Sequence, residues 1–452
     1  MGSVCCSGET GGEVVVDPDP QWTCLSSRLK AVGIDCATKD NFNLQAPRER
    51  LKAILRIDII RLLDASWLVK QPDDFVIKRR QDLPEDAFLP GDVAADICDF
   101  SGSIIPLSYG WLTKFHPDPN AFHMKTVRQF LNKCIFARIA ETSPCQSSDC
   151  RFAANMSDLY RAEKPKELWG FCCGACATSN GQGHGILCQR VPAQQVGQQS
   201  SVRIGLFWDF ASLPQPDAAG QRTADESIHF KCGLPMINLL YGDAFNMVVR
   251  LTRMPSEFPE SLGDGWNMTP YLQRGWCVFE AMVASLTKAP NCHLDLGLVA
   301  GQLEDDRAGW RDILTSASST RVPPQAPEEF REMLVSTKFT NGRTDRIIVG
   351  DIYTDFFKEA ASATDLNFQN ERADDGWGDF EIQQLVRVLP AFTRCREIRL
   401  TGHAKFGEQG LAALCDCLPQ LPALCKLVLP KHLEHTAQGQ IMRSLVSGVH
   451  FM

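Results

Sequence analysis

The sequence contains no uninterrupted apolar stretch that could span a bilayer, and its opening residues do not resemble a signal peptide. The chain nevertheless carries 19 cysteines. In a short secreted chain so many thiols would indicate disulfides, whereas a chain without a secretion signal is expected in a reducing compartment. We therefore predict a cytoplasmic protein in which most cysteines are buried apolar side chains.

A surplus of basic residues is also missing, because 54 Asp and Glu outnumber 46 Lys and Arg and give a formal net charge of -8. Binding to nucleic-acid phosphates needs a basic footprint. The longest basic run, Lys78 to Arg80, is flanked by acidic residues and is better explained as a solvated charged surface. These observations exclude nucleic acid as the main partner.

A second pair of cysteines at metal-binding spacing is absent. Two residues separate Cys173 from Cys176, a spacing that lets a tight turn aim both thiolates at one zinc ion. They lie between residues 140 and 200, a Cys-rich segment without sustained periodicity that we interpret as an inserted loop. Ordinary loop cysteines are the alternative to zinc coordination, and we assign no metal ligand.

What the chain does have is enough length for several domains, since 452 residues exceed the size at which a single core stops growing. Its composition is that of an ordinary folded protein. Changes in pattern divide it into a disordered or acylated amino terminus over 1–20, a helical segment and linker over 21–95, an α/β domain over 96–365 and a repeat tail over 376–452.

The first seven residues resemble dual-acylation signals. In such signals Gly2 receives myristate, and a neighbouring cysteine, here Cys5 or Cys6, receives palmitate. One myristoyl chain holds a protein only marginally to a membrane, so stable attachment needs the second chain. Acylation would place the protein at the cytoplasmic face of a membrane; an unmodified, disordered start is the alternative.

Apolar residues recur mostly at three- and four-residue steps over 46–69 and predict a helix there. Further along, the apolar runs 103–111, 203–210 and 245–251 predict buried strands, each followed by helical spacing. Strands that alternate with helices imply a parallel sheet covered on both faces. Such sheets place their ligands at the carboxyl ends of the strands.

Two segments near the carboxyl end align with each other. Residues 389–400 and 418–429 share their Leu-Pro openings and apolar strand positions at an offset of 29 residues, with a helix between them. The run resembles ribonuclease-inhibitor-type leucine-rich repeats. The sequence shows only about two units, whereas about three are needed for independent stability, so we expect the tail to dock on the main domain. We also expect it to contact a protein partner. An unrelated β/α end piece is the alternative.

The most informative segment runs from Tyr271 to Glu280 and reads Tyr-Leu-Gln-Arg-Gly-Trp-Cys-Val-Phe-Glu. It resembles the Tyr-x-x-Ser-x-Trp-Cys-x-x-Glu signature of plant-type Toll/interleukin-receptor (TIR) domains and the Arg-x-Trp-x-x-x-Glu segment of heterokaryon-incompatibility (HET) domains. Similar eukaryotic proteins carry Trp-Asp-x-x-Ser-Leu-Pro-Gln, as at 208–215, and Arg-Gly-Trp-Cys-x-Phe-Glu. The resemblance covers residues 103–290 and implies a flavodoxin-like parallel sheet and homotypic association.

In catalytic TIR domains the glutamate of this signature serves cleavage of NAD at the nicotinamide ribosyl bond, so the resemblance makes Glu280 the candidate catalytic residue. Loss of nicotinamide builds positive charge on the ribose, which a nearby carboxylate stabilises. NAD would be a substrate, and no cofactor is expected. The candidates for ligand binding are Ser108, Asp209, Trp276, Arg274 and Arg250.

Two departures from the plant-type pattern stand beside this resemblance. Ser108 is followed by Tyr109 and Gly110 where a basic residue is usual, and the loop after Asp209 carries prolines in place of the usual glycine. Glu280 also has a structural explanation as one half of a buried ion pair with an arginine, either Arg274 or Arg250. Asp209 has one as the cap of the following turn.

The sequence thus leaves three hypotheses. The first is a signalling or scaffold protein whose TIR/HET-like domain acts as an adhesive module that self-associates at a membrane surface. The second is an NAD glycohydrolase that uses Glu280. The third is a nucleoside-processing enzyme, which also relies on a carboxylate next to ribose.

Overall fold

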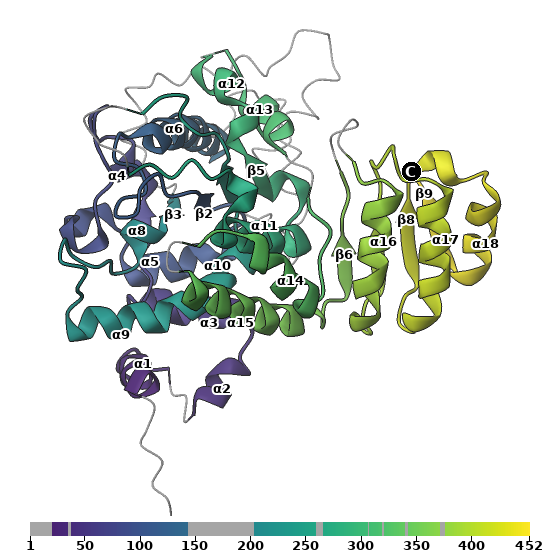
Figure 1. Ribbon diagram of the computed structural model, residues 1–452, viewed down its shortest axis with the longest axis horizontal. Helices are drawn as coiled ribbons and strands as arrows, with labels where there is room; N and C mark the ends of the chain where they lie inside the picture. Colours follow the sequence, from purple (N-terminus) through teal and green to yellow (C-terminus); the bar gives the residue numbers. More distant parts are fainter. Residues whose placement is uncertain are drawn as a thin grey trace, which may run out of the picture.

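The computed structural model describes residues 20–34, 38–142, 203–258, 265–305, 307–318, 321–339, 342–370 and 376–452. The predicted acylation site and the cysteines of the insertion lie outside these ranges. Within them, no helix combines the length and the apolar character that crossing a membrane requires. The chain forms an α/β domain and a smaller repeat unit packed against it (Figure 1).

The α/β domain is built on a five-stranded sheet with the order β1-β3-β2-β4-β5. Four of its strands are parallel: β2 (Ile104–Tyr109), β3 (Gly205–Phe207), β4 (Val248–Leu251) and β5 (His293–Asp295). The edge strand β1 (Leu63–Asp64) pairs antiparallel with β3. All six residues of β2 are buried, as expected for a central strand that is covered on both faces.

Helices cover both faces of this sheet (Figure 1). Successive residues of β2 point to opposite sides, so that Ile104 belongs to one apolar core and Ile105 to the other. The first core contains α3 (Pro47–Arg56), α10 (Ile237–Gly242), α11 (Gly275–Thr287) and α15 (Arg343–Ala360); the second contains α4 (Ala65–Leu68), α6 (Phe122–Thr142) and α13 (Trp310–Ala317). The predicted parallel α/β architecture is confirmed at this level.

The helix predicted over 46–69 is interrupted. Helix α3 ends at Arg56, Asp58 has a positive φ of 58°, and the chain enters β1 at Leu63. The Arg80 guanidinium donates to the carbonyls of Asp58 and Ile59 and so holds the turn in place. The apolar spacing was misleading because the residues of this turn are buried together with those of the helix.

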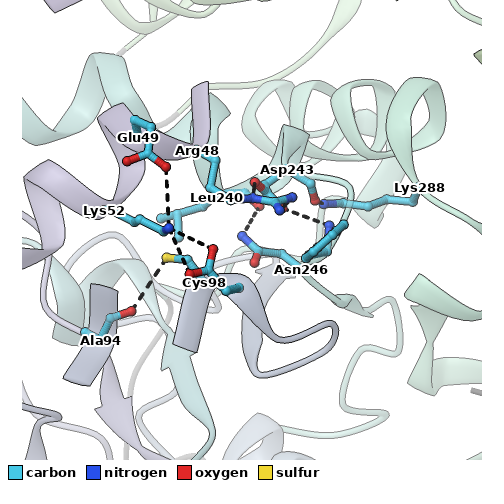
Figure 2. A network of polar contacts seen from close by, with 11 residues as sticks. Arg48, Glu49, Lys52, Ala94, Cys98, Leu240, Asp243, Asn246 and Lys288 are labelled. Atoms are coloured by element: carbon cyan, nitrogen blue, oxygen red, sulfur yellow. Dashed lines mark hydrogen bonds and ion pairs between the residues drawn. The ribbon is translucent and has the colours of Figure 1, made fainter. Parts of the chain in front are cut away.

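A polar network attaches α3 to the sheet (Figure 2). Asp243, which follows α10, accepts two hydrogen bonds from Arg48, at 2.9 Å from Nε and 3.0 Å from Nη2. Its backbone carbonyl accepts from the buried Lys288, and burial lowers the pKa of that lysine to about 8. Nearby, the Asn246 amide donates to the Leu240 carbonyl at 3.0 Å. The network ties the amino-terminal helices to the turn that precedes β4.

The remaining helices are shorter or peripheral. They are α1 (Pro20–Ala31), α2 (Lys39–Asn43), α5 (Gly91–Asp96), α8 (Asp209–Ser212), α9 (Ala224–Gly233), α12 (Ala300–Glu304) and α14 (Pro327–Met333). Of these, α1 packs against α9, and α14 packs against α15. Both contacts lie on the side of the sheet that carries the first core.

The repeat unit is a second sheet of four parallel strands in sequential order: β6 (Asp365–Asn367), β7 (Glu397–Arg399), β8 (Lys426–Leu429) and β9 (Gly448–Phe451). The helices α16 (Asp379–Val388), α17 (Glu408–Cys417) and α18 (Ala437–Leu445) alternate with them (Figure 1). Ile398 pairs with Leu427, which reproduces the offset of 29 residues. The second sheet begins with β6, before the predicted boundary at 376, because this strand lies outside the two aligned segments.

The repeat unit is held to the α/β domain by Arg321, whose exposed fraction is 5%. Its guanidinium donates to the carbonyls of Lys288, Asn367 and Gln369, and its own carbonyl accepts from Trp377 Nε1 at 2.6 Å. One side chain therefore satisfies carbonyls of both units in a buried place. The apolar core also continues across the junction.

Replacing Arg321 with Met should leave these carbonyls without their charged donor and lower the free energy of unfolding by about 3 kcal/mol. Because Trp377 is buried at the same place, denaturant titration followed by tryptophan fluorescence is a suitable measurement. Arg394→Met, which changes an exposed arginine of the repeat unit, is the matched control. Equal stability of the two variants would contradict this role of Arg321.

Candidate functional site

The candidate site lies where β2 and β4 run side by side. Along the sheet the parallel strands stand in the order β3-β2-β4-β5. The chain therefore passes from β2 to β3 on one side of β2 and then crosses to β4 on the other side. Ligands of open α/β sheets bind at the carboxyl ends of the strands at such a reversal of order. Ser108 of β2 is the register partner of Arg250 of β4, which places two predicted site residues next to each other at this edge.

Ser108, Tyr271 and Glu280 form a chain of short hydrogen bonds. The Ser108 hydroxyl donates to Glu280 Oε2 at 2.5 Å, and Ser108 Oγ lies 2.5 Å from the Tyr271 hydroxyl. Ser108 is fully buried and Glu280 is 9% exposed. The carboxyl therefore lies behind Ser108 and Tyr271, enclosed by the protein, and does not open directly onto the edge of the sheet.

The environment of Glu280 favours its protonated form. Burial raises the pKa of this carboxyl well above its ordinary value of 4.5, and the nearby charge of Asp209 raises it further, whereas the Ser108 hydrogen bond acts in the opposite direction. Neither Arg274 nor Arg250 forms an ion pair with Glu280 in the part of the chain that the structure describes. The surroundings of Glu280 therefore favour a hydrogen-bonded, neutral carboxyl over an ion pair.

Asp209 lies after β3 and opens the short helix α8. Its carboxylate accepts from the Tyr109 hydroxyl, from Trp111 Nε1 at 3.0 Å and from the Phe210 amide at 2.6 Å. Burial raises the pKa of Asp209. Tyr109 and Trp111 come from the end of β2 and the segment after it, so Asp209 links the ends of two neighbouring strands, and its bond from the Phe210 amide is local to α8.

Arg274 organises the loop before α11. Its guanidinium donates to the carbonyls of Thr269 and Asn267, both at 2.7 Å, and of Trp111 at 2.6 Å. A side chain at Gly110 would collide with this guanidinium. The Tyr109-Gly110 departure from the plant-type pattern therefore has a steric reason: Gly110 leaves room for an arginine that joins two loops.

Trp276 lies away from the other predicted site residues. Its indole Nε1 donates to Asp345 Oδ2 of α15 at 3.1 Å, and its ring packs edge-to-face on Phe279. These contacts hold α11 against α15. The structure thus brings Ser108, Glu280 and Arg250 to one region, gives Asp209 and Arg274 loop-holding contacts, and directs Trp276 to the packing of helices.

A pocket of about 700 Å³ opens beside this region, at the junction of the two units. Arg250, Tyr271 and Asp295 line it on the side of the α/β domain, and Trp377 and Lys405 line it on the side of the repeat unit. Glu280 is not among its lining residues, but Tyr271 connects the pocket wall to Ser108 and so to Glu280.

Sequence reasoning missed several of these lining residues. Asp295 ends β5 much as Asp209 follows β3, and that parallel placement was a usable signal. Tyr271 stands in the quoted signature, although its role was not assigned. Trp377 and Lys405 carry no such signal, because only the docking of the repeat unit brings them to this edge. Within the described ranges no cluster of His, Cys, Asp and Glu could hold a metal ion.

Replacing Glu280 with Gln keeps the shape of the neutral carboxyl but removes its titration. Because the folded pKa is raised, the folded protein keeps a proton that the unfolded chain releases above its ordinary pKa. The stability of the wild type should therefore fall as pH rises from 4.5 toward the folded pKa, by about 1.4 kcal/mol per pH unit. Across that window Glu280→Gln should gain stability relative to the wild type.

Urea unfolding of both proteins between about pH 5 and about pH 7 measures this difference. Glu408→Gln is the control, since it removes an exposed carboxyl from a helix of similar length. If the stability difference between Glu280→Gln and the wild type does not change with pH, the raised pKa of the buried Glu280 carboxyl is contradicted.

Comparison with known proteins finds no relative of this chain. No family model, no curated protein and no solved structure matches the chain.

Proposed function

We propose that this chain is a signalling or scaffold protein in which a TIR/HET-like domain self-associates. The order of its parallel strands supports a flavodoxin-like sheet. Of the four parallel strands, β3 lies on one side of β2, and β4 and β5 follow on the other side. The segment Tyr271 to Glu280 forms a short turn and the start of helix α11, the helix that follows β4 after a loop, as the TIR and HET signatures begin the helix after a central strand.

The enclosure of Glu280 is the observation that carries the proposal. A carboxylate that stabilises positive charge on a ribose has to be ionised and reachable, whereas Glu280 is buried, hydrogen-bonded to Ser108 and biased toward the neutral form. Asp209 and Arg274 are likewise engaged by groups of the protein itself. These residues serve the stability of the edge, which is what a binding module requires.

Exposed apolar side chains support self-association through the same edge. Phe115 follows β2, Met268 and Leu272 follow β4, and Leu298 follows β5, and each is more than half exposed. Single exposed apolar residues are ordinary on protein surfaces, but several on the loops of one edge are typical of an interaction site. A second copy of the domain would bury them.

The repeat unit supports a protein partner. Its strands and helices alternate at the spacing of ribonuclease-inhibitor-type leucine-rich repeats, and stacked repeats of this kind present an extended surface to other proteins. In the proposal, the α/β domain assembles copies of the chain while the repeat unit contacts the partner.

An NAD glycohydrolase is the second candidate, and one observation favours it. The hydrogen bonds from Tyr271 through Ser108 to Glu280 join the pocket wall to the carboxyl, so a proton could pass between them without opening the core. Incubation with NAD separates the two candidates. If the chain is a scaffold, we expect no release of nicotinamide. Release by the wild type that is lost in Glu280→Gln would establish the enzyme.

A double variant in which Phe115 and Met268 are both changed to Ser should not self-associate. Light scattering over a concentration series should show the average mass of the wild type rising with concentration, while the double variant stays monomeric. Leu44→Ser removes an exposed apolar residue that follows α2 and should behave as the wild type does. A wild type that remains monomeric at every concentration would refute assembly through this edge.

Membrane attachment through Gly2, Cys5 and Cys6 completes the proposal, although these residues lie outside the described part of the chain. Gly2→Ala should move the protein from the membrane fraction of cells to the soluble fraction. The variant cannot carry the myristoyl chain, and stable attachment needs two acyl chains. Gly11→Ala is the control for a change in the same segment. Unaltered pelleting of Gly2→Ala would refute acylation as the anchor.

A further inference from the structure

The pocket between the two units has the features of a small-molecule site. Its volume of about 700 Å³ lies within the range of known ligand pockets. It combines an apolar wall with a few charged groups, as such pockets do. The apolar wall consists of Pro270, Leu272, Val322 and Pro323, beside the aromatic residues Tyr271 and Trp377.

Arg250 is a buried cation of this pocket that makes few hydrogen bonds. It is 7% exposed, and its enclosed Nε has no hydrogen-bond partner among the residues that the structure describes. Its contact with Asp295, from Nη2, is long, at 3.4 Å, where charge-assisted bonds normally measure about 2.7–2.9 Å. A buried guanidinium normally has its donors satisfied, so the terminal N–H groups of Arg250 have capacity for a further acceptor in the pocket.

Asp295 does not neutralise Arg250 closely because its carboxylate is held elsewhere. Oδ1 accepts from the Thr252 hydroxyl at 2.6 Å and from the Gly297 amide at 2.8 Å, and Asp295 thereby caps the turn after β5. Only Oδ2 faces Arg250. The terminal N–H groups of the guanidinium that do not meet Asp295 are thus left for a second oxyanion, the group that arginine binds best.

The repeat unit supplies the opposite wall and a second cation. Lys405 lies in the segment between β7 and α17 and lines the pocket with an exposed side chain. Glu381, also in the lining, accepts from the Gly378 amide and so caps α16. The cation at the rim and the guanidinium at the base come from different units, so the pocket is complete only when the units are docked.

We propose that this junction pocket binds a small molecule with an oxyanion, a phosphate or a carboxylate, attached to a flat apolar body. The oxyanion accepts from Arg250, Lys405 adds attraction at the rim, and the apolar body lies along Pro270, Val322 and Pro323. The site is distinct from Glu280 and does not depend on NAD cleavage, and it shares only Leu272 with the residues proposed for self-association. Because both units line the pocket, a bound ligand stabilises their docking.

Isothermal titration calorimetry of the full chain tests this with three probes: phenyl phosphate, benzoate and inorganic phosphate. We expect saturable binding of phenyl phosphate or benzoate that is tighter than that of inorganic phosphate. The tighter of the two aromatic probes identifies the oxyanion. Arg250→Gln should weaken that binding about tenfold or more, and Arg253→Ala, which removes an exposed arginine of the loop after β4, should leave it unchanged.

Lys405→Glu provides a second variant, because a charge reversal on an exposed side chain leaves folding intact where Arg250→Gln could disturb the sheet. It should weaken binding of the same probe several-fold, and more strongly at low salt. The proposal is overturned if neither aromatic probe binds saturably, or if both variants bind as the wild type does.

Discussion

The burial of a carboxyl at the point where the sheet reverses its strand order governs the rest of this structure. Glu280 lies on a helix that is apolar on nearly every side, and an ionised carboxylate there would be costly. The protein meets this cost with the Ser108 hydroxyl and with a raised pKa that favours the neutral acid. Ser108 in turn holds Tyr271, so the end of the central strand and the start of helix α11 are fixed together.

The same edge gains its outer wall from the repeat unit. Arg321 satisfies carbonyls on both sides of the junction, and Trp377 closes over it from the second sheet. This docking converts an open sheet edge into a pocket with Arg250 at its base. Two parts of the chain that are far apart in sequence therefore act as one structure at the place where α/β sheets bind their ligands.

The sequence predicted the elements with strong local patterns and missed what depends on packing. Alternating strands and helices predicted the parallel sheet, and the 29-residue offset predicted the pairing of β7 with β8. The helix expected over 46–69 was interrupted because burial of a turn imitates helical spacing. Ser108, Glu280 and Arg250, which the sequence offered as candidate site residues, lie in one region of the structure, but their protonation and partners depend on three-dimensional contacts that no motif specifies.

The central claim is that Glu280 is a neutral, enclosed carboxyl in the folded protein. Infrared difference spectroscopy of the wild type against Glu280→Gln measures this directly, since protonated and ionised carboxyl groups absorb differently. We predict a protonated-carboxyl band at neutral pH that persists in the folded wild type and is missing from the variant. An ionised-carboxylate band that the substitution removes would contradict this account and would restore Glu280 as a candidate catalytic anion.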